Sequence, residues 1–174
     1  FEAMASGGKD AKFSREALWQ AAELYDKAGH EKNAVAAYER YVKQHPNPLE
    51  PAIEARYRLA AYSKKSGQSA RHLAWTRELV EADRNGGRER TDRTRYLGAI
   101  SSLVLLEPQE EAYRQVRLVE PLKKNLKVKK ARMQTLLDAY GRVTDYGVAE
   151  VATAAAYHTA ELYTDFSRAL INSQ

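Results

Sequence analysis

The chain contains no cysteine. Without thiols it has no disulfides, no thiolate zinc sites and no cysteine nucleophile. A chain without free thiols suits an oxidising compartment, so the composition favours the bacterial periplasm or cell envelope, with the cytoplasm as the alternative. Long apolar runs are lacking too, since none approaches the roughly 20 residues that a membrane helix needs. We therefore expect no membrane span.

Motifs for catalysis and cofactor binding are also lacking. There is no G-x-x-x-x-G-K-[ST] phosphate loop and no G-x-G-x-x-G turn after a strand. The histidines lie far apart, and none stands in an HExxH or similar metal spacing: His30, His45, His72 and His158. The sequence therefore predicts no catalytic residues, no metal site, no cofactor and a protein that is not an enzyme.

What the chain does have is helical periodicity. Apolar residues recur at threes and fours through almost all of its 174 residues, and no segment alternates like a strand. Turn residues divide the pattern into about seven to eight segments. We therefore expect an all-α fold.

The most regular segment runs from Leu18 to Pro46. Small residues there let two antiparallel helices approach closely, and aromatic residues fill the space between neighbouring helices. Gly29 supplies a left-handed backbone that ends the first helix, and Pro46 cannot continue the second. We expect helices over 14–28, with Ser14 as N-cap, and over 31–45. The pattern comprises Leu18, Ala21, Ala22, Tyr25, Gly29, Ala34, Tyr38 and Pro46.

These residues stand at the spacing of one tetratricopeptide repeat (TPR), and the segment resembles that family. From LYDKAG to AAYERYVKQHP it is most similar in style to bacterial cell-envelope TPR proteins. The resemblance implies a right-handed stack of antiparallel helical pairs that holds another protein or peptide segment. In such proteins the first helix of each pair lines a concave groove for the partner. That places the partner-binding groove on Glu16, Trp19, Glu23, Asp26, Tyr57 and Ala61.

Trp19 has two interpretations that the sequence leaves open. It is either an aromatic anchor for the partner or part of the core between helical pairs. In the chaperone-binding subclass of TPR proteins, Lys and Asn clamp a C-terminal carboxylate from this surface. Trp19 and Glu23 stand in those positions here, so we expect that clamp to be absent.

The pattern predicts a single TPR-like domain over 13–174, as a segment of a longer protein. Residues 1–12 are interpreted as an artificial leader or a disordered linker. Residues 13–46 form the clear repeat, and 52–87 form a degenerate one with helices at 52–66 and 69–85. Residues 91–174 are atypical helices.

The atypical part begins with a helix over 91–107 and a short helix that starts at Pro108, with Glu110 and Glu111 as first-turn acids. Two longer helices follow, over about 118–143 and 148–170. Their apolar residues recur at threes and fours over more turns than a repeat helix has. We expect these two helices to pair antiparallel at the end of the stack.

Basic character is concentrated in one segment. The net charge is +5, and residues 123–132 carry six cations and no acid. They are either the solvated back of a helix whose buried side is Leu122, Leu126 and Met133, or a surface for nucleic acid or anionic lipid. We favour the solvated back, because the segment has no aromatic residue for base stacking. The candidate basic surface is Lys123, Lys124, Lys127 and Lys130.

The function that we expect is a non-catalytic scaffold that binds a partner protein segment in the groove. The alternative is a nucleic-acid or anionic-surface binding module acting through residues 123–132, and an enzyme whose site is completed by further chain ranks third. We expect no specific nucleic-acid binding. Partner identity and oligomeric state stay open at this point.

Overall fold

The computed structural model describes residues 11–173, and within them all regular structure is helical. The predicted all-α class is therefore confirmed for this part of the chain. The elements are α2 (Ala11–Lys27), α3 (Glu31–Gln44), α4 (Leu49–Lys65), α5 (Ser69–Asn85), the short 3-10 helix η1 (Gly87–Glu89), α6 (Asp92–Val104), α7 (Glu107–Arg114), α8 (Leu122–Thr144) and α9 (Ala149–Ile171). The expected leader, residues 1–12, lies outside the described residues except for the first two positions of α2.

Contacts group the chain into two compact units, one ending at Gly98 and one starting at Ala99. The division falls inside α6, and each unit has a hydrophobic core of its own. The prediction of a single domain over 13–174 concerns how the units are joined, and it stays a prediction.

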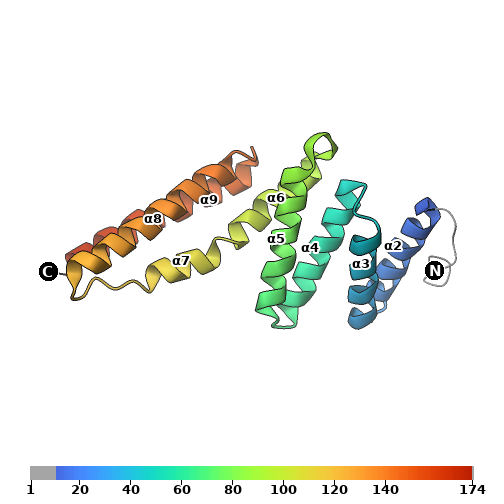
Figure 1. Ribbon diagram of the computed structural model, residues 1–174, viewed down its shortest axis with the longest axis horizontal. Coiled ribbons are helices and arrows are strands. Elements are labelled where there is room, and N and C mark those ends of the chain that lie inside the picture. The colour runs from blue at the N-terminus through green and yellow to red at the C-terminus, as the bar shows by residue number, and fades with distance from the viewer. Residues whose placement is uncertain (1–10, 174) are drawn as a thin grey trace. The chain divides into compact units, whose positions relative to one another are not determined.

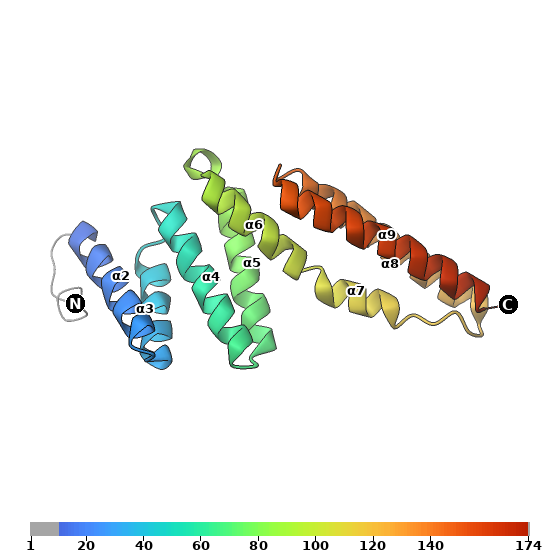
Figure 2. The same ribbon diagram turned by 180° about the vertical axis from the view of Figure 1, so that it is seen from behind.

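In unit 1 the helices α2 to α5 pack in chain order, each on the next (Figure 1). Their core includes Leu18, Tyr38, Tyr41 and Leu59, all buried. The same order is visible from behind in Figure 2. Consecutive helices therefore form antiparallel neighbours joined by short turns.

The turns of unit 1 follow from glycine. Gly29 and Gly67 have φ values of 73° and 72°, the left-handed conformation that side chains disfavour. At the end of α2 the amide of His30 then donates to the carbonyl of Tyr25 at 2.9 Å, which satisfies a free helix carbonyl. The prediction that Gly29 ends the first helix is confirmed.

Two details of unit 1 differ from the expectation. Ser14 is not an N-cap, because it lies inside α2 and is buried. Helix α4 begins at Leu49 rather than at residue 52, since Pro51 falls in the first turn, where no intrahelical N–H bond is required. Gly86 ends α5 in a right-handed conformation, and a Cβ there would lie 2.3 Å from the Leu49 side chain. The helix predicted over 69–85 therefore ends where expected, and close packing explains the glycine that follows it.

In unit 2 the long helices α8 and α9 pack side by side, and α7 packs on α8 (Figure 2). A short turn joins α8 to α9, so the predicted antiparallel pair of long helices is confirmed. The shared core includes Tyr113, Leu136, Tyr140, Val151 and Leu162. Helix α8 starts at Leu122, later than expected, because Pro121 precedes it in an extended conformation.

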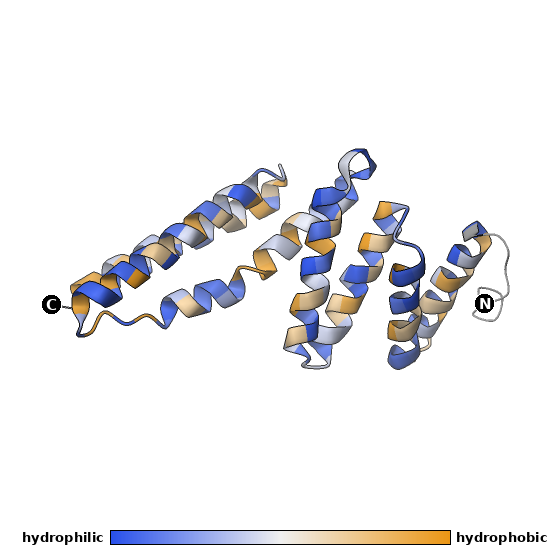
Figure 3. Cartoon of the chain, viewed as in Figure 1, coloured by the Kyte–Doolittle hydropathy of each residue, from blue (hydrophilic) through white to orange (hydrophobic). Residues whose placement is uncertain are grey.

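Hydrophilic and hydrophobic residues alternate around the helices of both units (Figure 3). This is the pattern of amphipathic helices that bury one face and expose the other. No helix in residues 11–173 is both long and apolar enough to cross a membrane.

Candidate functional site

The predicted groove lies on α2 and α4, and an acidic residue ties these helices together. The Asp26 carboxylate accepts a hydrogen bond from Arg58 at 2.8 Å and another from the Tyr62 hydroxyl. Burial, then the bond to Asp26, raises the pKa of Tyr62 well above its ordinary value. Asp26 is therefore already satisfied within the chain and does not stand free to attract a basic ligand.

A second pair of contacts links α4 to the start of α6. The guanidinium of Arg93 donates to Glu54, and the Thr91 hydroxyl donates to Glu50 at 2.5 Å. The bond to Glu54 raises the pKa of Arg93 further. Together with the Asp26–Arg58 pair, these contacts hold α2, α4 and the first turns of α6 in a fixed lateral order.

Trp19 faces the core of unit 1. Its ring is half-buried and meets Tyr38 edge-on at 5.7 Å and Tyr41 at 5.3 Å between centroids. Edge-to-face pairs at this separation are favourable beyond their buried area. The geometry favours the core interpretation of Trp19 over the partner-anchor interpretation.

The other predicted groove residues remain accessible to different degrees. Glu16, Tyr57 and Ala61 are exposed, while Glu23 is half-buried. Within the described residues, no hydrogen bond or ion pair joins two of the six predicted positions. Sequence reasoning missed Leu24, which is 51% exposed on α2 and whose leucine side chain gave no sign of facing solvent.

The candidate basic surface lies on α8 in unit 2. Lys123, Lys124, Lys127 and Lys130 are all exposed. Spacings of three and four put Lys123, Lys127 and Lys130 on one side of the helix. No acidic side chain in residues 11–173 forms an ion pair with any of the four.

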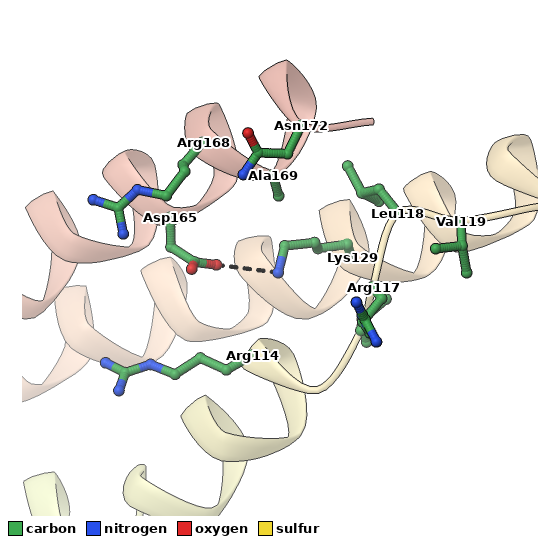
Figure 4. A pocket seen from close by; sticks show the side chains of 10 residues that line it. Arg114, Arg117, Leu118, Val119, Lys129, Asp165, Arg168, Ala169 and Asn172 are labelled. Atoms are coloured by element: carbon green, nitrogen blue, oxygen red, sulfur yellow. Dashed lines mark ion pairs between the residues drawn. The ribbon is translucent and has the colours of Figure 1, made fainter. Parts of the chain in front are cut away.

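The other two cations of the segment bind neighbouring groups of the chain, Lys129 from a buried position and Arg132 from an exposed one. Arg132 donates to the carbonyl of Ala112, and the Lys129 ammonium lies 3.1 Å from an Asp165 oxygen (Figure 4). Lys129 also lies 4.1 Å from the centre of the Tyr113 ring and donates to the Tyr113 carbonyl at 3.4 Å. A buried ammonium is costly unless paired, and these three partners compensate it.

The position of Lys129 was readable from the sequence. It stands three residues after Leu126 and four before Met133, within the stripe that we assigned to the buried side of the helix. We counted it as a solvated lysine because of its residue type. The spacing along the helix predicts that Lys129 is buried, whereas its residue type wrongly suggested an exposed side chain.

A second feature that sequence reasoning missed is a polar cluster around Glu110. Glu110 lies in the first turn of α7, as predicted, and its side chain is buried. The Tyr140 hydroxyl donates to its carboxylate, His158 Nδ1 lies 3.2 Å away and Arg114 lies 3.6 Å away. The rings of Tyr140 and His158 stack at 5.4 Å. The cluster thus joins α7, α8 and α9.

Electrostatics in this cluster favour a neutral phenol. Burial and the bond to Glu110 raise the pKa of Tyr140 far above its ordinary value of 10.0. Within residues 11–173, no group of three or more His, Asp or Glu side chains is placed to hold a metal ion.

No known family model matches the chain, and neither a curated protein nor a solved structure does.

Proposed function

We propose that this chain is a non-catalytic scaffold that binds a segment of a partner protein on the first-helix face. This face is formed by the outward side chains of α2 and α4, with Glu16, Leu24, Tyr57 and Ala61 exposed on it. The observation that carries the proposal is the lateral tie of α2 to α4 and of α4 to α6 through Asp26–Arg58 and Glu54–Arg93. A preordered face loses little conformational entropy when a partner binds.

Tyr57 is the central contact in this proposal. The residue is 37% exposed on α4, where it follows Glu54, the partner of Arg93, and precedes Arg58, the partner of Asp26. Tyrosine combines a large apolar ring with a hydroxyl, and such residues concentrate binding energy at interfaces. The partner segment that fits here presents an apolar side chain to Tyr57 and polar or basic groups to Glu16 and Glu23.

The repeat class and the compartment belong to the same proposal. The residue pattern over 18–46 and the sequential packing of α2 to α5 support a TPR-like stack. The absence of cysteine supports a bacterial periplasmic or cell-envelope location. The open reading frame that surrounds the segment tests the location, since a signal peptide or lipobox is required for it.

Site-specific photocrosslinking tests the binding face. A photoreactive phenylalanine analogue replaces Tyr57 in the full protein in its native cells, and the control position is Lys43, which is exposed on α3. We expect a discrete crosslinked partner from position 57 and none from position 43. Crosslinks from position 43 alone, or from neither position, contradict the proposal.

The alternative function rests on a different observation. The four exposed lysines of α8 have no acidic partner in the described chain, which leaves a surface able to meet nucleic acid or anionic lipid. This candidate predicts an affinity for polyanions that falls as the salt concentration rises.

A further inference from the structure

A cationic hollow opens in unit 2 where the connection after α7 passes α8 and α9 (Figure 4). It has a volume of about 290 Å³. Its cationic lining is Arg114, Arg117, Lys129 and Arg168, and Asp165 is the one carboxylate that the described part of the chain contributes. Leu118 and Val119 form an apolar wall beside these charges. The hollow is therefore built to receive a group with negative charge and some apolar surface.

A second hollow of about 440 Å³ continues along α9. It shares Arg114, Asp165 and Arg168 with the first and reaches Tyr157, whose ring is 63% exposed. From Tyr157 to Ile171 at its end, α9 rises by about 21 Å at 1.5 Å per residue. An extended peptide of about seven residues spans that length.

The arginines differ in how far they are already engaged. Arg114 lies at 3.6 Å from Glu110 and 3.7 Å from Glu161, distances of loose ion pairs rather than hydrogen bonds. Arg117 and Arg168 are exposed and form no ion pair within residues 11–173. Lys129 is compensated by Asp165. Among the described residues, the guanidinium groups of Arg117 and Arg168 are thus the ones that no carboxylate already engages.

The geometry points to an acidic peptide segment of a partner protein as the occupant of this groove, which we call the α7–α9 groove. Carboxylates accept paired hydrogen bonds from the planar guanidinium group, and three arginines surround the first hollow. The second hollow has as many carboxylates as cations and carries Tyr157, which suits an apolar residue of the same peptide. The groove lies in unit 2 and is separate from the first-helix face, so either site can fail without the other.

Nucleic acid fits the groove less well. Asp165 and Glu161 both line it and repel a continuous phosphate backbone. Single-stranded nucleic acid is bound along cationic tracks with several stacking rings, whereas among residues 11–173 only Tyr157 brings an aromatic ring to either hollow. A peptide can place its carboxylates beside the arginines and keep neutral residues beside Asp165.

Fluorescence anisotropy on the whole chain tests the groove. The probe is a fluorescein-labelled octapeptide of glutamates with one central leucine, and the reference peptide carries glutamine in place of each glutamate. We expect the glutamate peptide to bind at least about tenfold more tightly than the glutamine peptide. The double variant Arg117→Glu, Arg168→Glu is expected to remove this preference.

A matched control separates the groove from net charge. Lys124→Glu, Lys127→Glu changes the net charge by the same amount on the exposed side of α8, and neither lysine lines either hollow. We expect its affinity to stay within about threefold of the wild type. Equal weakening in both double variants overturns the proposal, as does a wild type that does not distinguish the two peptides.

Two further measurements complete the test. If the arginine reversal lowers the thermal stability, the milder pair Arg117→Gln, Arg168→Gln is used, and it must also lose the preference for glutamate. A single-stranded oligonucleotide is added as competitor at equal charge concentration. Unlabelled peptide is the reference competitor. If the oligonucleotide displaces the labelled peptide at a lower concentration than this reference, the assignment of the groove to a peptide is overturned.

Discussion

Lys129 of α8 and Asp165 of α9 form an ion pair of 3.1 Å in which the cation is the buried partner. The Lys129 side chain is 3% exposed, and the Asp165 side chain is 40% exposed. The ammonium has left water and depends on protein partners, whereas the carboxylate still reaches solvent. Removing the two partners is therefore expected to have unequal effects.

We expect Asp165→Ala to destabilise unit 2 more than Lys129→Met does. Loss of the carboxylate leaves a buried ammonium with only the Tyr113 ring and carbonyl, at a cost of about 2–4 kcal/mol. Lys129→Met replaces the cation by an apolar chain of similar length and leaves a carboxylate that water can solvate, at about 1 kcal/mol. Urea unfolding followed by far-ultraviolet circular dichroism measures both.

The choice of probe matters for that measurement. The chain has two tryptophans, Trp19 and Trp75, and both lie in unit 1, so their fluorescence does not report on unit 2. The double variant Lys129→Met, Asp165→Ala serves as the control and is expected to recover part of the loss of Asp165→Ala. If the double variant loses more free energy of unfolding than the two single variants lose together, the buried ammonium is not the cause of the loss in Asp165→Ala.

Trp19→Ala is expected to lower the stability of unit 1 by about 2–4 kcal/mol, because the ring packs edge-on against Tyr38 and Tyr41. Trp19→Phe keeps part of the ring contact and is expected to lose less. Thermal melting monitored by circular dichroism measures both changes. If Trp19→Ala melts within a few degrees of the wild type, the ring contributes little to the core, and the interpretation of Trp19 as a partner anchor is favoured instead.

The sequence predicted the fold class because periodicity and turn residues act locally. Helix ends at Gly29 and Gly67, and the apolar stripe of the two long helices, follow from backbone and spacing rules alone. The predicted starts of α4 and α8 were less accurate. Pro51 lies in the first turn of α4 and Pro121 directly precedes α8, so proline rather than the apolar pattern determines where these helices begin.

The candidate site was harder to predict than the fold. Asp26 was assigned to ligand binding, but its partners Arg58 and Tyr62 lie 32 and 36 residues away in the sequence. Glu110 meets Tyr140 across 30 residues. The sequence around a carboxylate is similar whether the side chain faces solvent or belongs to a buried cluster. The distant partners of Asp26 and Glu110 could therefore not be identified from the residues next to them.

Asp26→Ala is expected to destabilise unit 1 by about 1–2 kcal/mol. The change removes the ion pair to Arg58 and leaves the half-buried Tyr62 hydroxyl without its acceptor. Glu16→Ala, on the exposed side of the same helix, is the matched control and is expected to stay within about 0.5 kcal/mol of the wild type. Tryptophan fluorescence in a urea titration reports this unit. Equal effects of the two substitutions contradict the assigned role of Asp26.

The stability of unit 2 is expected to fall as pH rises above about 10. Burial and the bond to Glu110 raise the pKa of Tyr140, so the folded state keeps the phenolic proton where the unfolded state releases it. The unfolded state then binds fewer protons, and the free energy of unfolding decreases with pH. Tyr140→Phe removes the contribution of Tyr140 and makes the decrease shallower by about 1.4 kcal/mol per pH unit. A decrease remains in this variant, because burial also raises the pKa of Tyr113. Denaturation of the wild type and of Tyr140→Phe at pH 9 and pH 11 measures how far the free energy of unfolding falls in each protein. Equal decreases in the two proteins contradict the prediction.

The exposed lysines of α8 provide the last prediction. If they form only a solvated helix back, the charge reversal Lys124→Glu, Lys127→Glu leaves stability within about 0.5 kcal/mol, because neither side chain has an acidic partner in residues 11–173. We expect this outcome, together with no specific oligonucleotide binding at physiological salt. A binding surface for nucleic acid behaves differently: affinity falls steeply with the logarithm of salt concentration as counterions are released, and the reversed variant loses both affinity and slope. Anisotropy titrations of a labelled oligonucleotide at low and physiological salt distinguish the two cases. Sub-micromolar, salt-sensitive binding that disappears in the reversed variant would replace the scaffold by the nucleic-acid alternative.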